Sequence, residues 1–303
     1  MFGFRSNQPV VWFHKKLDQS NAYCIYCGAD LRDGSTASNK EHLIGREFIP
    51  TGALGGTAFN LIFRSCTKCN ERKRDLERHV STLTLIVSPA RTESVELDAL
   101  ALRKARGDFH PHKKGSAVID AHASVEVPFR LGPVTGSFGI VGPPQMDTYI
   151  AYDLAAYHVQ GFFSLITSVD PTTADGTNLL PARSIFYAPP YTHRDWGNPQ
   201  LLEVVRRVQT WERLCVVSTA NGFFRAEFRR DRSRNSGGTS QWFWALEWNK
   251  STRVVGVIKD PNEALPLFAD LPPLRWIRIS PIERMREERP LSADQDDLLF
   301  RYE

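Results

Sequence analysis

Hydrophobic and polar residues alternate most regularly in the last third of the chain. There, Asn221-Gly222 separates two alternating segments, and this dipeptide is typical of tight β-hairpin turns. Two further alternating segments follow after Gly-rich or polar turns. The pattern predicts a four-stranded antiparallel meander with strands at 214–220, 223–230, 241–248 and 253–260.

The third of these strands carries three indoles in the alternating series Trp242, Trp244, Leu246 and Trp248. Trp242, Trp244 and Trp248 therefore share one face of the strand. Packing into the core of the sheet is the favoured interpretation, because aromatic side chains bury large apolar surfaces. The alternative is an aromatic platform for a flipped or modified base.

Helical spacing of apolar residues predicts several helices, and the clearest has no Gly or Pro until Pro89. The predicted helices cover 67–85, part of 90–118, 148–166 and 199–211. Short strands are expected at 40–44, 60–65, 124–131 and 136–141. The fold class is therefore α+β: an N-terminal unit of two strands and a helix, then an α+β region that contains the antiparallel meander. We place an N-terminal domain at 1–95, a helix with a basic linker at 96–118 and a second domain at 119–303.

Composition and charge point to a globular protein with a polyanionic partner. Residues are 42% hydrophobic and 24% charged, and no apolar run is long enough to span a membrane. The first residues lack the pattern of a signal peptide, so we expect a cytoplasmic protein. Residues 1–116 hold 18 Lys and Arg against 12 Asp and Glu, and such a basic surplus favours nucleic acid. DNA is the expected partner, and RNA is not excluded.

Four of the five cysteines form two pairs with metal-ligand spacing. Cys24 and Cys27 form one CxxC unit, and Cys66 and Cys69 form the other. Two intervening residues let a tight turn direct both sulfurs at one ion, and two such turns complete a tetrahedron. We therefore predict a structural Zn²⁺ site. Cys215 lies in an apolar run and is predicted to be a buried small residue.

The residues between and after the cysteine pairs carry a recognisable order. Glu41-His42 lies between the pairs, Asn60 follows, and Asn70 comes directly after Cys69. This order resembles the HNH (ββα-metal) nuclease family, in the branch with two CxxC zinc knuckles. The resemblance covers about residues 22–80. It implies a β-hairpin and a helix that hold one catalytic Mg²⁺ or Mn²⁺, and hydrolysis that leaves 5′-phosphate and 3′-hydroxyl ends.

The resemblance also implies roles for single residues. His42 would be the general base, a task that suits a neutral imidazole at neutral pH. Asn60 would orient that base, and Glu41 and Asn70 would bind the catalytic metal. Glu41 and His42 should lie on opposite faces of their strand. The cations after Asn70 on the helix could contact the phosphate backbone; they are Arg72, Lys73, Arg74 and Arg78.

Two positions depart from the family pattern: Glu41 stands where Asp is common, and Gly45 stands where Pro is frequent. Glu77 is expected to be a solvated charge and His79 a helix-surface residue. A structural role in a turn is the alternative for Asn60.

The rival interpretation of the chain is a non-catalytic zinc ribbon that binds nucleic acid or regulates a partner. For residues 119–303 the sequence leaves the fold and role open. An activating protein or ligand, control of the target, self-association and a part in defence against foreign DNA all fit this architecture.

Overall fold

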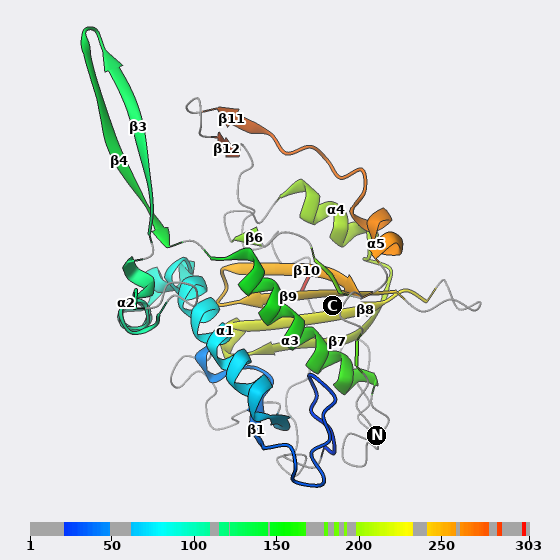
Figure 1. Ribbon diagram of the computed structural model, residues 1–303. Coiled ribbons are helices and arrows are strands. Elements are labelled where there is room, and N and C mark those ends of the chain that lie inside the picture. The colour runs from blue at the N-terminus through cyan, green and yellow to red at the C-terminus, as the bar shows by residue number, and fades with distance from the viewer. Residues whose placement is uncertain are drawn as a thin grey trace.

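The computed structural model places the N-terminal unit against a six-stranded antiparallel sheet (Figure 1). It describes residues 21–48, 62–109, 115–120, 122–144, 146–167, 179–180, 185–187, 191–192, 198–232, 241–258, 261–278, 284–286 and 299–300. Asn60 lies outside this part of the chain, so its predicted role is not addressed by the structure.

The predicted meander is confirmed. Its strands β7 to β10 pair in sequence order, and β5 and β6 extend the sheet beyond β10. The strands of this sheet are β5 (Ile185–Tyr187), β6 (Tyr191–Thr192), β7 (Glu212–Thr219), β8 (Phe224–Arg230), β9 (Trp242–Trp248) and β10 (Thr252–Ile258). Asn221 adopts φ 55° and Gly222 adopts φ 84° in the first turn, and these positive values explain the Asn-Gly dipeptide there.

Helices cover both faces of the sheet, and the four predicted helical regions are confirmed. The helix predicted to reach residue 211 ends earlier, at Arg207. The helices are α1 (Thr67–Ile86), α2 (Val95–Gly107), α3 (Thr148–Thr167), α4 (Pro199–Arg207) and α5 (Pro261–Phe268). None of the helices in the described ranges combines the length and the apolarity that a membrane crossing requires.

Side chains of β9 alternate between two hydrophobic cores. Trp244 and Trp248 are fully buried on the face that α3 covers, and Trp242 lies in the same core. Phe243 and Ala245 face the opposite way, into a core with α4 and α5. Burial on both faces explains why the sequence of this strand is almost continuously apolar. The indoles are thus core residues, as the favoured interpretation predicts.

The N-terminal unit consists of a hairpin followed directly by a long helix. β1 (Ser38–His42) pairs antiparallel with β2 (Ile62–Cys66), and α1 begins at the next residue. α1 lies beside α3, which crosses the sheet (Figure 1). Phe48, after β1, stacks on Trp248 of the sheet with ring centroids 6.1 Å apart. Segments on both sides of the predicted linker therefore share one core.

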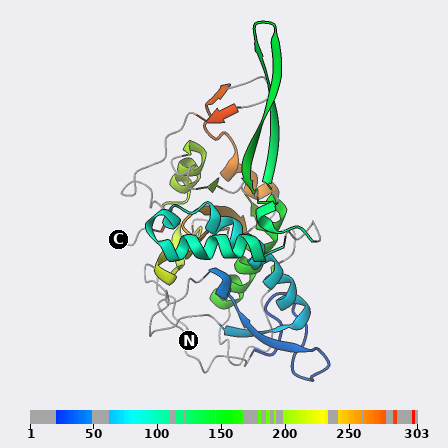
Figure 2. The same ribbon diagram turned by 90° about the vertical axis from the view of Figure 1, so that its left-hand side faces the viewer.

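Two further two-stranded sheets lie away from this core. β3 (His122–Leu131) and β4 (Val134–Pro144) form a long hairpin, and β11 (Trp276–Arg278) pairs with β12 (Arg284–Arg286). In both views the β3–β4 hairpin projects from the body of the protein (Figures 1 and 2).

The second half of α1 is tied to the sheet by Asn249. This buried amide donates hydrogen bonds to the Ser81 carbonyl (2.9 Å) and to Thr84 Oγ1 (2.8 Å). Its backbone adopts φ 51° in the β9–β10 turn, and the next residue, Lys250, adopts φ 53°. The contact joins segments that are more than 160 residues apart in the sequence.

We predict that Asn249→Gly lowers the free energy of unfolding by about 1–3 kcal/mol, because glycine tolerates the backbone but leaves buried acceptors without their donor. Urea unfolding measures the change. Lys250→Gly is the matched control, since it makes the same substitution at a similar backbone angle without removing a buried hydrogen bond. Equal losses in both variants would contradict the role assigned to the amide.

Candidate functional site

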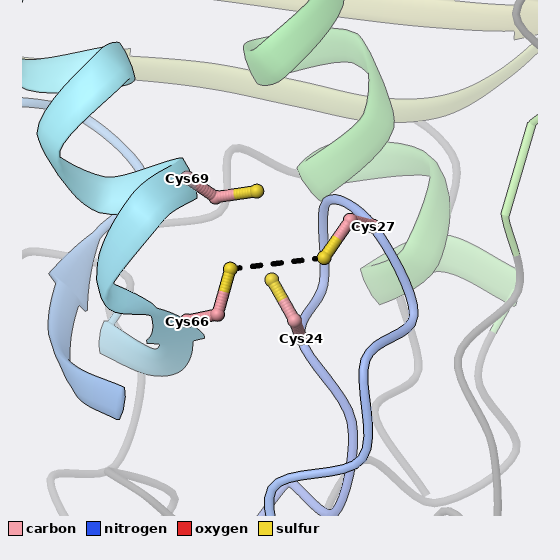
Figure 3. Close-up of side chains that lie close together, drawn as sticks. All are labelled: Cys24, Cys27, Cys66 and Cys69. Atoms are coloured by element: carbon pink, nitrogen blue, oxygen red, sulfur yellow. Dashed lines mark hydrogen bonds between the residues drawn. The ribbon is translucent and has the colours of Figure 1, made fainter. Parts of the chain in front are cut away.

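The four paired cysteines converge on one point, as their spacing predicts (Figure 3). Their sulfurs all lie within 4.8 Å of one another. Cys24 and Cys27 sit in a turn where the Gly28 N–H donates to the Cys24 carbonyl, and Gly28 adopts φ 73°. Cys66 ends β2 and Cys69 lies in the first turn of α1. The cluster therefore joins the N-terminal turn to the start of the helix.

The arrangement of the sulfurs fits a tetrahedral zinc ion. A Zn–S distance near 2.3 Å places sulfurs about 3.8 Å apart in a tetrahedron. Cys27 Sγ and Cys66 Sγ are 3.7 Å apart. Four thiolates fill the coordination shell, so an ion held here would be structural.

Electrostatics at the cluster also favour a cation. A hydrogen bond from Cys69 lowers the pKa of Cys24 to about 5, whereas burial raises the pKa of Cys27 to about 11. Donation to Cys24 and burial raise the pKa of Cys69 as well. Without a metal, ionisation of one thiol therefore opposes ionisation of its neighbours. A divalent cation removes that repulsion and allows all four sulfurs to bind as thiolates.

Glu41 lies beside this cluster in a buried ion pair. Its side chain is buried, and its Oε1 accepts hydrogen bonds from Lys73 Nζ (2.7 Å) and from the Tyr26 hydroxyl (3.1 Å). Burial raises the pKa of Glu41, although Lys73 opposes the shift. The carboxylate that was expected to bind a catalytic metal therefore binds the Lys73 ammonium group instead. Glu41 does not fit the role of an open metal ligand in this arrangement.

Lys73 is fully buried between two carboxylates. Besides Glu41, its ammonium donates to Glu77 Oε1 (2.5 Å) and to the main-chain carbonyl of His42 (2.9 Å). Burial acts to lower the pKa of Lys73, but the two carboxylates outweigh it and raise the pKa. The expectation that Lys73 contacts nucleic acid is wrong, because its side chain points into the core and is occupied there.

Glu77 and His79 are also buried, which corrects the expectation of a solvated charge and a helix-surface histidine. Both lie on the part of α1 that the body of the protein covers. Burial acts to raise the pKa of Glu77, but Lys73 and His158 outweigh it and the pKa is lowered. The i,i+4 spacing of Lys73 and Glu77 was the available sequence signal for this ion pair.

The side chain of Glu77 leaves room only for glycine at position 45. A Cβ atom on Gly45 would lie 2.2 Å from the carboxylate carbon of Glu77. Any larger residue there would displace the buried carboxylate. The close approach of Glu77 thus explains why glycine stands at position 45.

His42 lies on the face of β1 opposite Glu41, as alternation predicts. Its side chain is half-buried, whereas that of Glu41 is buried. Burial lowers the pKa of His42 to about 4, and the positive charges of Arg46 and Lys40 add to the shift. The imidazole is therefore neutral at pH 7, and the lowered pKa makes it a weaker base than an ordinary histidine.

His158 on α3 completes the buried network and was not identified from the sequence. Its Nε2 lies 3.7 Å from Glu77 Oε1, and the imidazole is fully buried against Phe48, Phe224 and Trp248. Burial lowers its pKa to about 4, so it is neutral at pH 7. No pattern near His158 in the sequence indicates this contact, because only the packing of α3 against α1 brings it to Glu77. The contact of Tyr26 with Glu41 likewise has no signal in the neighbouring sequence.

The remaining predicted site residues lie on the outer side of α1. Asn70 Nδ2 donates to Asn39 Oδ1 (2.6 Å) and to the Lys40 carbonyl (3.0 Å), which ties the helix to β1. Arg72 pairs with Asp153 of α3 at 2.7 Å. Arg74 and Arg78 are more than half exposed and lie beside Asp75 and Asp108. These three arginines, unlike Lys73, remain accessible to a phosphate backbone.

Comparison of the chain with protein-family profiles, curated proteins and solved structures finds no match.

We predict that the purified protein contains close to one zinc ion per chain and that Cys66→Ser removes it. The loss should also destabilise the fold, because the cluster joins the N-terminal turn to α1. Elemental analysis together with thermal unfolding measures both effects. Cys215→Ser is the matched control, since Cys215 lies in the core away from the cluster, and it should retain zinc. Equal zinc content in the Cys66 variant and the native protein would contradict the assignment.

We also predict a loss of stability in mild acid that depends on His158. In the unfolded chain this histidine binds a proton below about pH 6.5, whereas in the folded protein it does so only near pH 4. Its contribution is therefore complete above pH 6.5, and on the order of 3 kcal/mol is lost as the pH falls to 4.

The variant His158→Gln cannot titrate and should lose less stability over the same pH interval. Urea unfolding at pH 7 and at pH 4.5 measures the difference between the two proteins. The quantity to compare is the change in the free energy of unfolding between the two pH values, not the stability at one pH. This comparison separates titration from any packing cost of the substitution. Identical pH dependence in both proteins would show that His158 does not carry the effect.

Proposed function

We propose that the protein is a metal-dependent endonuclease of HNH type that hydrolyses phosphodiester bonds of DNA, with His42 as general base. The observation that carries the proposal is the setting of His42. A neutral, half-buried imidazole ends a strand whose partner strand leads into the cysteine cluster, and exposed Lys40 and Arg46 lie close enough to lower its pKa. The same two cations would attract a phosphodiester. The negative charge of the bound phosphate would raise the pKa of His42 toward the range that suits a general base.

In the proposed reaction, a ring nitrogen of His42 accepts a proton from water as the water oxygen attacks phosphorus. The bond to the 3′ oxygen of the preceding nucleotide breaks and that oxygen takes a proton from solvent, which leaves 5′-phosphate and 3′-hydroxyl ends. The cysteine cluster with zinc would keep β1 and α1 in place. Exposed Arg72, Arg74 and Arg78 on α1 are candidates for contacts with the backbone of the nucleic acid.

A catalytic Mg²⁺ or Mn²⁺ is part of the proposal, and in a bound state it would neutralise charge on the phosphate. The side-chain nitrogen of Asn70 donates hydrogen bonds to β1, so its side-chain oxygen is the atom that could bind the ion. Glu41 is engaged by Lys73 and does not fit as a second ligand of the ion.

The pairing of Glu41 with Lys73 specifically favours a second candidate function. A protein that binds nucleic acid through a zinc ribbon without cutting it needs no free carboxylate beside His42. The same cations on β1 and α1 would then serve binding alone.

We predict that the purified full chain with Mg²⁺ or Mn²⁺ cuts DNA and that His42→Ala reduces the rate at least about a hundredfold, because general-base catalysis contributes about that much. Plasmid, linear duplex, single-stranded DNA and RNA are the substrates to compare. DNA affinity and zinc content should stay close to those of the native protein.

Arg103→Ala on the exposed side of α2 is the control variant, and it should cut like the native protein. Native protein that binds DNA but cuts none of the four substrates with either metal would favour the second candidate. Unchanged cutting by His42→Ala would exclude His42 as the base.

A further inference from the structure

The β3–β4 hairpin has one apolar face and one polar face. The register pairs Val127 with Phe138, Phe129 with Gly136 and Leu131 with Val134. Since directly paired residues point to the same side of a sheet, these six residues form one face. We call it the apolar hairpin face. The opposite side carries the alternate pairs, which are Glu126 with Gly139, Pro128 with Ser137 and Arg130 with Thr135.

The apolar hairpin face is largely uncovered. Leu131 is 72% exposed, Val134 59%, Phe138 50% and Phe129 38%. Phe129 lies over Gly136, and its ring centroid is 6.1 Å from that of Phe138, so the two rings form a continuous surface. The hairpin projects from the body in both views (Figures 1 and 2). A two-stranded sheet with an open apolar face is only marginally stable in water.

The charge of the hairpin restricts what can cover this face. Between residues 126 and 139 it holds one Glu and one Arg, both on the polar side. Nucleic acid and anionic lipid both require a surplus of cations, which the hairpin lacks. The fitting occupant is itself apolar and uncharged. A second copy of the chain presents such a surface, and two identical faces satisfy each other about a two-fold axis.

Face-to-face stacking is favoured over pairing along the strand edge. In a two-residue hairpin the closing pair, Leu131 with Val134, exchanges ladder hydrogen bonds, and every second pair does so from there. By this count the pair of Pro128 with Ser137 exchanges no ladder hydrogen bonds. The backbone N–H of any other residue at position 128 would therefore point to the outer edge of β3. Proline at that place discourages the addition of another strand.

The area of the face sets the expected strength of the contact. The four exposed side chains offer roughly 350 Å² per copy, given about 200 Å² for a whole aromatic side chain. Stable complexes bury about 800 Å² per partner. Because the face offers less than half of that area, a dimer held by it alone should be weak and should dissociate on dilution.

We infer that the protein self-associates into a two-fold dimer by stacking the apolar hairpin face on the same face of a second copy. This inference does not rest on the nuclease proposal.

Sedimentation velocity of the full chain with zinc, from about 1 to 100 μM, tests it, because a weak dimer should form only toward the upper end of this range. The native protein should be monomeric at the lowest concentration, and its dimer fraction should rise toward 100 μM. Phe129→Ser combined with Phe138→Ser should raise the dissociation constant at least about tenfold, because aromatic residues dominate such contacts. Thr135→Ala combined with Ser137→Ala changes the polar face of the same hairpin and should leave the constant unchanged.

Leu131→Glu is a second test that does not depend on the two rings, because this residue lies at the exposed tip of the hairpin. It should also weaken the dimer, with zinc content and circular dichroism unchanged. A native protein that stays monomeric at 100 μM overturns the inference, and binding of that monomer to neutral lipid vesicles would identify lipid as the occupant. Dimers that persist in both apolar-face variants overturn it as well.

Discussion

The structure depends above all on the buried ammonium of Lys73, which lies between the carboxylates of Glu41 and Glu77. One buried cation with two buried anions is stable only when every partner is in place, and removing one partner of such a set typically costs about 3–5 kcal/mol. The ion pairs join β1 to α1, and His158 brings α3 to the same point. The hairpin, the long helix and the helix on the sheet thus meet at one polar centre inside an apolar core.

Helix α1 carries three different attachments along its length. Its first turn belongs to the cysteine cluster, its middle carries Lys73 and Glu77, and its second half accepts hydrogen bonds from Asn249 of the sheet. The setting of His42 follows from this arrangement, because the Lys73 ammonium also holds the main-chain carbonyl of His42. Any movement of α1 relative to the sheet would therefore change the surroundings of the imidazole.

Much of the secondary structure was predictable because its signals are local. The Asn221-Gly222 turn, the alternation in β9 and the absence of Gly and Pro from α1 each act over a few residues. The cysteine cluster was predictable for a related reason, since CxxC spacing already describes half of a tetrahedral site. The same local reasoning failed for Lys73, Glu77 and His79. These residues lie in a charged segment of the helix, which is typical of an exposed surface. Nothing near them in the sequence indicates that α3 and the sheet cover that side of α1.

By itself, then, the sequence determined the strands of the meander, the helices α1 to α4, the convergence of the four paired cysteines and the place of His42 at the end of a strand. Only the tertiary structure decided which charges are buried, because burial depends on segments that lie far apart in the chain. Glu41 changes from an expected metal ligand to the partner of Lys73 for this reason. His158 enters the site from α3, 81 residues after its partner Glu77 in the sequence. Composition and spacing describe the chemical groups; their packing decides which of them solvent, metal or nucleic acid can reach.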